Sequence, residues 1–167
     1  MTPVVEVRPA RTADVVAIRG LVDAYVADRR LLAKATVTLY EDVQEFVVAV
    51  ADDRVVGCGA LHVLWEDLAE VRTLAVAADF QGRGVGSAVL EALIGRARQL
   101  GIRRLFCLTF ETDFFARHGF VEISGAPVSP EVFAQLLQSY DEGVAEFLDL
   151  ERVKPNTLGN VRMLRIL

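Results

Sequence analysis

Seven residues near the middle of the chain, Gln-Gly-Arg-Gly-Val-Gly-Ser at positions 81–87, have the composition of an anion-binding turn. Glycines at positions 82, 84 and 86 leave the backbone N–H groups accessible, because no Cβ stands over them. A helical pattern begins at Val85, and the first N–H groups of a helix, together with the helix dipole, favour phosphate. Arg83 adds a cation within the same turn. We therefore predict that residues 81–87, the glycine turn, bind a diphosphate.

The spacing of the glycines decides which kind of nucleotide site this is. A dinucleotide fingerprint G-x-G-x-x-G needs a third glycine where this chain has Ser87, and the Gly-Lys pair of a P-loop occurs nowhere. The pattern present is Gln-x-x-Gly-x-Gly, placed between a predicted strand and a predicted helix. It resembles the acetyl-CoA signature of the GNAT superfamily of N-acetyltransferases. An ordinary glycine turn is the alternative reading.

The predicted elements alternate in a way that indicates an α/β fold. Apolar or alternating runs predict strands at residues 4–8, 46–51, 54–64, 69–76, 103–109 and 161–166. Helical periodicity predicts helices from an N-cap at Thr12 to residue 28, at 40–44, at 85–100, at 112–118 and after Pro130. Hairpins followed by a strand–helix–strand crossover predict a mixed sheet covered by helices. Gly57 and Gly59 within one strand indicate a bulge or a close approach there.

Composition limits the class of protein. The chain has 167 residues, of which 53% are hydrophobic, so we expect one core and a single domain over residues 1–167. No apolar run reaches the length of a membrane span, and the N-terminus lacks a signal-peptide layout. Cys58 and Cys107 lie in apolar strand-like segments, which suits reduced thiols and a cytoplasmic location. The net charge of −5, without a long basic tract, argues against nucleic acid as a partner.

The order of elements also resembles a GNAT domain over most of the chain. The resemblance implies a mixed central sheet whose two central strands splay apart, with helices on both faces, and a pantetheine arm that enters the gap like an extra strand. It implies acetyl-CoA as co-substrate and these contacting residues: Leu74, Ala75, Val76, Gln81, Gly82, Arg83, Gly84, Val85, Gly86 and Ser87. No metal is expected, since neither His62 nor His118 has cysteines or carboxylates at metal-ligand spacing.

Transfer to an amine needs a base, a polarised carbonyl and a proton for the leaving thiolate. Glu70 is the candidate base, because the matching strand position carries the catalytic glutamate in several GNAT enzymes. Pairing of Glu70 with Arg72 is the alternative reading. The resemblance implies that the backbone N–H near Val76 stabilises the oxyanion. Many family members place a proton-donating Tyr where this chain has Phe115, which leaves Cys107 and Tyr40 as weaker candidates for the acid.

The acceptor site is inferred from a narrower resemblance. Residues 30–46 and 56–61 resemble the acceptor region of amino-acid N-acetyltransferases of the N-acetylglutamate synthase type, in particular the short, stand-alone mycobacterial form. This resemblance implies that Leu32 offers its backbone to the substrate, that Lys34 holds a carboxylate and that Thr73 contacts the ligand. The Arg-Arg-Ser of long-form synthases is absent, and Gly159-Asn160-Val161 stands in its place. Arg72, Asn160 and Arg162 are the candidates to compensate.

We therefore expect direct acetyl transfer from acetyl-CoA to the α-amino group of L-glutamate or L-glutamine, the first step of arginine biosynthesis. Neither cysteine lies in a nucleophile setting, which disfavours an acetyl-enzyme. The alternatives are a GNAT enzyme for another amine (a polyamine, a peptide N-terminus or an aminoglycoside) and a non-catalytic acyl-CoA sensor. An apolar stripe over residues 132–137 faces either the core or a second subunit, so the sequence leaves a homodimer open.

Overall fold

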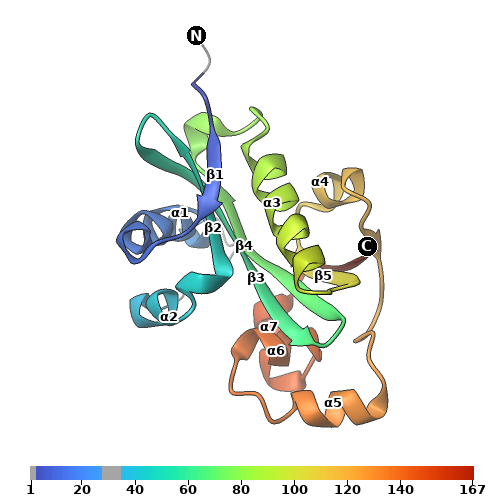
Figure 1. The fold of residues 1–167 in the computed structure, drawn as a ribbon. Coiled ribbons are helices and arrows are strands. Elements are labelled where there is room, and N and C mark those ends of the chain that lie inside the picture. Colours follow the sequence, from blue (N-terminus) through green and yellow to red (C-terminus); the bar gives the residue numbers. More distant parts are fainter. Residues whose placement is uncertain (1–2, 28–34) are drawn as a thin grey trace. The chain divides into compact units, whose positions relative to one another are not determined.

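The computed structural model describes residues 3–27 and 35–167, and Figure 1 shows their arrangement. Within these residues a seven-stranded sheet has the order β1-β2-β3-β4-β5-β7-β6. The strands are β1 Glu6–Pro9, β2 Phe46–Ala51, β3 Arg54–Trp65, β4 Leu68–Val76, β5 Arg104–Thr109, β6 Val121–Glu122 and β7 Val161–Ile166. The predicted strands are confirmed with small shifts at their ends, and β6 is the strand that the sequence pattern missed.

The sheet is mixed, as predicted. Strands β1, β2 and β3 pair antiparallel, and so do β5, β7 and β6. Strand β4 runs parallel to β5, with a register from Leu68↔Arg104 to Glu70↔Phe106. This register ends well before β4 does, at Val76, so the later part of β4 has an edge outside the β5 ladder.

The helices include four that were predicted with similar bounds and two that were not. They are α1 Val15–Ala27, α2 Thr36–Glu41, α3 Val85–Gln99, α4 Thr112–Arg117, α5 Pro130–Leu136, α6 Glu142–Phe147 and α7 Lys154–Thr157. The short helix expected at 40–44 was misplaced, because α2 begins at Thr36 and a 3-10 turn follows at Val43–Glu45. No described helix is long and apolar enough to cross a membrane.

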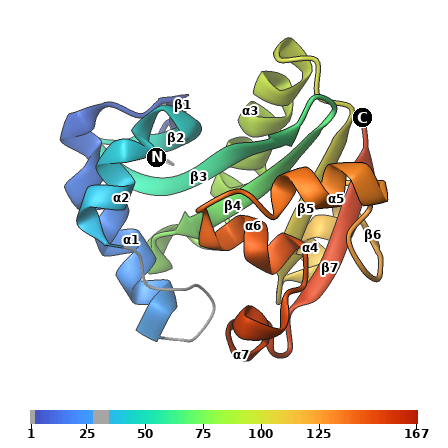
Figure 2. The same cartoon turned by 90° about the horizontal axis from the view of Figure 1, so that it is seen from below.

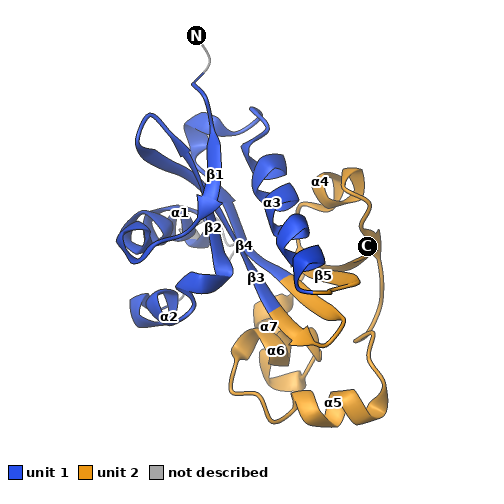
Figure 3. Cartoon of the chain, viewed as in Figure 1, with its two compact units in different colours: residues 1–62, 71–100 blue, residues 63–70, 101–167 orange. Residues whose placement is uncertain are grey.

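The chain divides into two compact units, which Figure 3 colours separately. Unit 1 comprises Met1–His62 and Val71–Leu100, and unit 2 comprises Val63–Glu70 and Gly101–Leu167. Strand β4 therefore contributes Glu70 to unit 2 and all its later residues to unit 1.

In unit 1, helices α1 and α2 cover one face of the strands and α3 covers the other (Figure 1). The α1–α2 side is a cluster in which Val15, Ile18, Val22 and Leu39 pack with Cys58, Ala60 and Ala75. On the α3 side, a Cβ added to Gly57 would come within 2.7 Å of the Val85 side chain. The register between β2 and β3 also shifts at Ala49/Val50, opposite Gly57. Both the predicted bulge and the predicted close approach are thus present.

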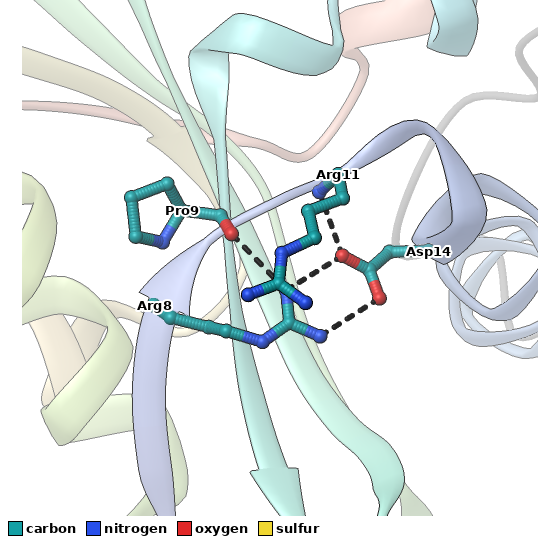
Figure 4. A network of polar contacts seen from close by, with 4 residues as sticks. All are labelled: Arg8, Pro9, Arg11 and Asp14. Carbon is teal, nitrogen blue, oxygen red and sulfur yellow. Dashed lines mark hydrogen bonds and ion pairs between the residues drawn. The ribbon is translucent and has the colours of Figure 1, made fainter.

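The start of α1 differs from the prediction, because Thr12 is not its N-cap. A 3-10 turn at Thr12–Asp14 precedes α1, and Arg11 occupies the cap position. The Asp14 carboxylate accepts the Arg11 backbone N–H at 2.7 Å and both terminal nitrogens of Arg8 at 2.8 and 3.0 Å (Figure 4). The reason is that Asp14 caps the chain from inside the turn, which leaves no role for the Thr12 hydroxyl.

In unit 2, α5 and α6 lie on one side of β5 and α4 on the other (Figure 2). Leu136, Val144 and Phe147 pack with Leu68 and Phe106, and Val132 and Phe133 lie against the same cluster. Val132, Phe133 and Leu136 of the stripe over residues 132–137 therefore face the core, whereas Ala134 and Leu137 are exposed. Helix α6 was not predicted, although its N-cap is regular: the Asp141 side chain accepts the Val144 N–H at 3.0 Å.

Candidate functional site

The glycine turn has the geometry of an open binding loop. Gly82 and Gly84 adopt φ values of 74° and 81°, the left-handed region that favours glycine. Gly84 is the N-cap of α3, and a Cβ at either glycine would meet nothing within 4 Å. The backbone of the turn is therefore exposed where the first N–H groups of α3 lack intrahelical partners. Val85 is buried and packs at Gly57, so the helix start is held against β3.

Two arginines flank an aromatic ring beside this turn. The guanidinium groups of Arg83 and Arg54 lie 5.2 and 5.8 Å from the centroid of the Phe80 ring. Arg54 also forms a two-point ion pair with Asp79 at 2.7 and 3.0 Å, and the hydrogen bond from Arg54 lowers the pKa of the Asp79 carboxyl. Asp79 is thus neutralised by Arg54, and Arg83 remains the cation within the turn.

The end of β4 makes an unforeseen contact with α1. The Val76 N–H donates to the Tyr25 hydroxyl at 3.0 Å, and the same hydroxyl donates to the Val76 carbonyl at 3.3 Å. Gln81 Nε2 reaches this hydroxyl at 3.5 Å. Tyr25 therefore occupies the two backbone groups expected to serve the acyl-CoA arm and the oxyanion. The sequence showed Tyr25 only as one member of a helical stripe.

A strained residue lies just before this point on β4. Thr73 has a φ of 56°, which a β-branched residue adopts only at a strain of about 1–3 kcal/mol. It is buried, and the Cys58 thiol donates to its carbonyl at 3.5 Å. Burial raises the pKa of the Cys58 thiol to about 12, so this sulfur is a protonated donor at neutral pH. Arg72, the neighbouring acceptor-site candidate, is half-buried in unit 1.

Unit 2 contains the candidate base. Glu70 is only 4% exposed and pairs with Phe106 in the β4–β5 ladder. Burial, and secondly the charge of Glu70, raise the pKa of the Cys107 thiol well above its ordinary value. Cys107 therefore stays protonated at neutral pH and is itself 1% exposed.

Arg162 is held by backbone carbonyl groups of unit 2. Its Nε donates to Gly125 O at 3.0 Å, its Nη1 donates to Glu146 O at 3.1 Å, and its Nη2 donates to Phe147 O. The guanidinium also stacks over the Phe106 ring at 4.9 Å. Burial lowers the pKa of Arg162, although the negative charges of Asp149 and Glu70 act to raise it. These contacts link β7 to α6, so the geometry favours a structural role for Arg162.

Asn160 presents a different picture. It precedes β7, and its Oδ1 atom is buried without a hydrogen-bond partner among the described residues. A buried amide oxygen of this kind can accept a hydrogen bond from a ligand amine or a water. Leu32 and Lys34, the other acceptor candidates, lie outside the described residues.

Phe115, which stands where many family members have a tyrosine, has a packing role. Phe115 is buried, with edge-to-face contacts to Phe114 and Phe120 at 5.2 and 5.1 Å. It cannot donate a proton. Tyr40, on α2, is 45% exposed.

Unit 1 also contains a histidine–carboxylate pair that the sequence pattern did not indicate. His62 Nδ1 lies 2.5 Å from Glu45 Oε1, and both side chains are about three-quarters buried, with 23% and 24% exposure. The two residues are distant in sequence, so no spacing signal links them. Within the described residues no group of three or more His, Cys, Asp or Glu side chains could hold a metal ion.

Comparisons with known proteins point to one family. Residues 20–121 match the acetyltransferase (GNAT) family. An amino-acid acetyltransferase of Mycobacterium tuberculosis is 60% identical over 164 residues, which cover 96% of this chain and 94% of that protein.

Solved structures agree with this match. A crystal structure from Mycobacterium tuberculosis in complex with CoA and NLQ is 60% identical, with a TM-score of 0.94, over 97% of this chain and 99% of that one. The N-acetylglutamate synthase of Neisseria gonorrhoeae, complexed with coenzyme A and N-acetyl-glutamate, is 25% identical with a TM-score of 0.79. That match covers 100% of this chain but 36% of the synthase. The predicted GNAT fold is confirmed, and the chain belongs to the GNAT family of acetyltransferases.

Proposed function

We propose that this chain transfers an acetyl group from acetyl-CoA to the α-amino group of L-glutamate or L-glutamine, as in the first step of arginine biosynthesis. The observation that carries the proposal is 60% identity to an amino-acid acetyltransferase over 96% of the chain. A second support is the complex of the Neisseria synthase with coenzyme A and N-acetyl-glutamate. We further propose that residues 1–167 act as one acetyltransferase domain in the cytoplasm.

The glycine turn fits a diphosphate, which supports acetyl-CoA as co-substrate. Its backbone is open at Gly82 and Gly84, Arg83 supplies a cation, and the start of α3 supplies the dipole. The proposed contacts are Leu74, Ala75 and Val76 on β4 together with residues 81–87. Gly84→Ala should weaken acetyl-CoA binding, because a Cβ disfavours φ of 81°. Gly101→Ala is the control, since Gly101 has a φ of 85° at the other end of the same helix.

The chemistry follows from the proposed roles. The acceptor amine loses a proton to Glu70, directly or through one water, and its nitrogen attacks the thioester carbonyl. The carbon–sulfur bond then breaks, and the thiolate leaves. An α-amino group with a pKa near ~8 needs only modest help from a base at neutral pH. The Val76 N–H would contribute about 3 kcal/mol as an oxyanion donor once it is released from Tyr25.

The acceptor side remains a proposal based on resemblance. Lys34 would bind the substrate carboxylate, and Leu32 would offer its backbone to the substrate. Arg72 and Thr73 on β4 and Asn160 before β7 would complete the contacts. Of these, Asn160 has a buried amide oxygen available for a new hydrogen bond. Arg162 is proposed with them only as a support for the segment that carries Asn160, because three carbonyl groups already hold its guanidinium.

The deciding experiment measures CoA release with a panel of acceptors at a fixed acetyl-CoA concentration. Turnover with glutamate or glutamine supports the proposal. Turnover restricted to a polyamine, a peptide N-terminus or an aminoglycoside would replace the acceptor. Acetyl-CoA binding without turnover of any amine would instead identify an acyl-CoA sensor. Glu70→Gln, which keeps the shape of the side chain, is the matched control for background hydrolysis.

A further inference from the structure

The edge of β4 that faces away from β3 ends at Val76. The Ala77 N–H donates to Val56 O on β3 at 2.8 Å, and successive residues of an extended strand direct their backbone groups to opposite sides. The N–H and carbonyl of Val76 therefore point away from β3. This is the side on which an added strand or a strand-like ligand would pair with β4.

The Tyr25 hydroxyl fills this position. It accepts from the Val76 N–H at 3.0 Å and donates to the Val76 carbonyl at 3.3 Å. With Gln81 Nε2 at 3.5 Å, the single donor and the two lone pairs of a hydroxyl are all engaged. One side-chain oxygen thus performs both roles that a peptide group of a neighbouring strand would perform.

An acyl-CoA arm needs the same two groups. Its pantetheine amides carry N–H donors for the Val76 carbonyl, and its thioester oxygen is the proposed partner of the Val76 N–H. The thioester oxygen cannot pair with the Val76 N–H while the Tyr25 hydroxyl remains there, because one N–H makes one good hydrogen bond. We propose, building on the acetyl-CoA function above, that the Tyr25 hydroxyl blocks the β4 edge at Val76 in the unliganded chain. The acyl-CoA arm then binds by displacing this hydroxyl from Val76.

The surroundings of Tyr25 allow such a displacement. A cavity of about 720 Å³ is bordered by Tyr25, Val76 and Gln81, together with small residues of α1 that include Gly20 and Ala24. This cavity lies beside Tyr25, so we expect the hydroxyl end of the ring to move into it.

Removal of the hydroxyl should make acetyl-CoA bind more tightly. In the wild-type chain the competent state is a fraction of the total, and the apparent dissociation constant is raised by the inverse of that fraction. The net contribution of typical hydrogen bonds corresponds to a factor of about two to ten. Calorimetry should therefore show that Tyr25→Phe lowers the Kd for acetyl-CoA by about two- to tenfold. Tyr140→Phe, at a fully exposed tyrosine, should leave the Kd unchanged.

Two further readouts separate displacement from a general change in structure. The Kd for ADP, a diphosphate without a pantetheine arm, should be the same in Tyr25→Phe and wild type. Amide exchange at Val76 should be faster in unliganded Tyr25→Phe than in unliganded wild type, and acetyl-CoA should make the two equal. In turnover, the KM for acetyl-CoA should fall while the acceptor KM stays constant.

The outcomes are distinct. A Kd for acetyl-CoA that is unchanged or higher in Tyr25→Phe overturns the displacement, as does an equal tightening for ADP or unaltered Val76 exchange. If the wild-type chain does not bind acetyl-CoA, the proposed function fails together with this inference. Binding by wild type without any effect of Tyr25 overturns this inference alone.

Discussion

Gly59 on β3 faces Val89 on α3 so closely that a Cβ on the glycine would lie 2.8 Å from the valine Cγ1. The same Cβ would lie 3.0 Å from Leu93 and 3.1 Å from Leu74. Helix α3 begins at the glycine turn, so this contact sets how near the turn lies to the end of β4.

Substitution of Gly59 should therefore affect stability and ligand binding together. Gly59→Ala inserts a methyl group against a stiff valine, and overpacking of this kind costs about 1–3 kcal/mol of unfolding free energy. Denaturant titration measures this loss, and calorimetry should show weaker acetyl-CoA binding because the helix start shifts. Gly95→Ala in the same helix is the control: nothing lies within 4 Å of a Cβ there. It should stabilise by about 0.5–1 kcal/mol.

Glu70→Gln should lower kcat by about 100- to 10,000-fold, the usual contribution of a general base. The Kd for acetyl-CoA should change little, because the proposed binding residues begin at Leu74. Glu66→Gln, at an exposed turn beside β4, should retain wild-type kcat. A Glu70→Gln enzyme with normal kcat would remove this residue from the mechanism.

Lys34→Ala should raise the acceptor KM by about 10- to 100-fold, the range for a lost hydrogen bond to a charged group. The KM for acetyl-CoA should not respond. The other lysine of the chain, Lys154, pairs with Glu151 at an exposed site, and Lys154→Ala should leave both KM values unchanged. A normal acceptor KM in Lys34→Ala would move the carboxylate site elsewhere.

Asp14 should make stability depend on pH in acid. The hydrogen bond from Arg8 lowers the pKa of the Asp14 carboxyl, so the unfolded chain takes up this proton at a higher pH than the folded chain. The carboxylate therefore stabilises fully above its unfolded pKa of about 4, and this contribution is lost as pH falls through the lower folded pKa.

The measurement for Asp14 is the unfolding free energy of wild type and Asp14→Asn from neutral pH downward. The variant should be less stable by about 1.5–3 kcal/mol at neutral pH, and the difference should shrink below pH about 4. Asp23→Asn, which breaks an exposed i,i+4 pair with Arg19, should cost about 0.5 kcal/mol or less. A constant difference for Asp14→Asn at all pH values would contradict the linkage.

The two cysteines should be unreactive in the folded chain. Burial raises the pKa of Cys58 to about 12 and that of Cys107 well above its ordinary value, so thiolate is scarce at pH 8. A thiol reagent should label both only after denaturation, whereas an added cysteine in Ser124→Cys should react at once, because position 124 is exposed. Fast labelling of the native chain would reopen a route through an acetyl-cysteine intermediate. Initial-velocity plots for the two substrates that intersect would support direct transfer.

Local patterns in the sequence determined most of the elements and the glycine turn. The glycines at 82 and 84, the strand before them and the helix after them are read from short-range sterics and period, which neighbouring residues alone decide. For the same reason, Gly57 and Gly59 indicated a close approach of another element, although the sequence did not show which one.

Only the tertiary structure decided which distant groups meet. Tyr25 and Val76 are 51 residues apart, and their contact depends on how α1 packs over the end of β4. Likewise, Arg162 looked available for a carboxylate, but the fold places three carbonyl groups around its guanidinium. Which residues distant in sequence share a hydrogen bond depends on strand register and helix packing. The spacing of residues within one segment determines neither of these.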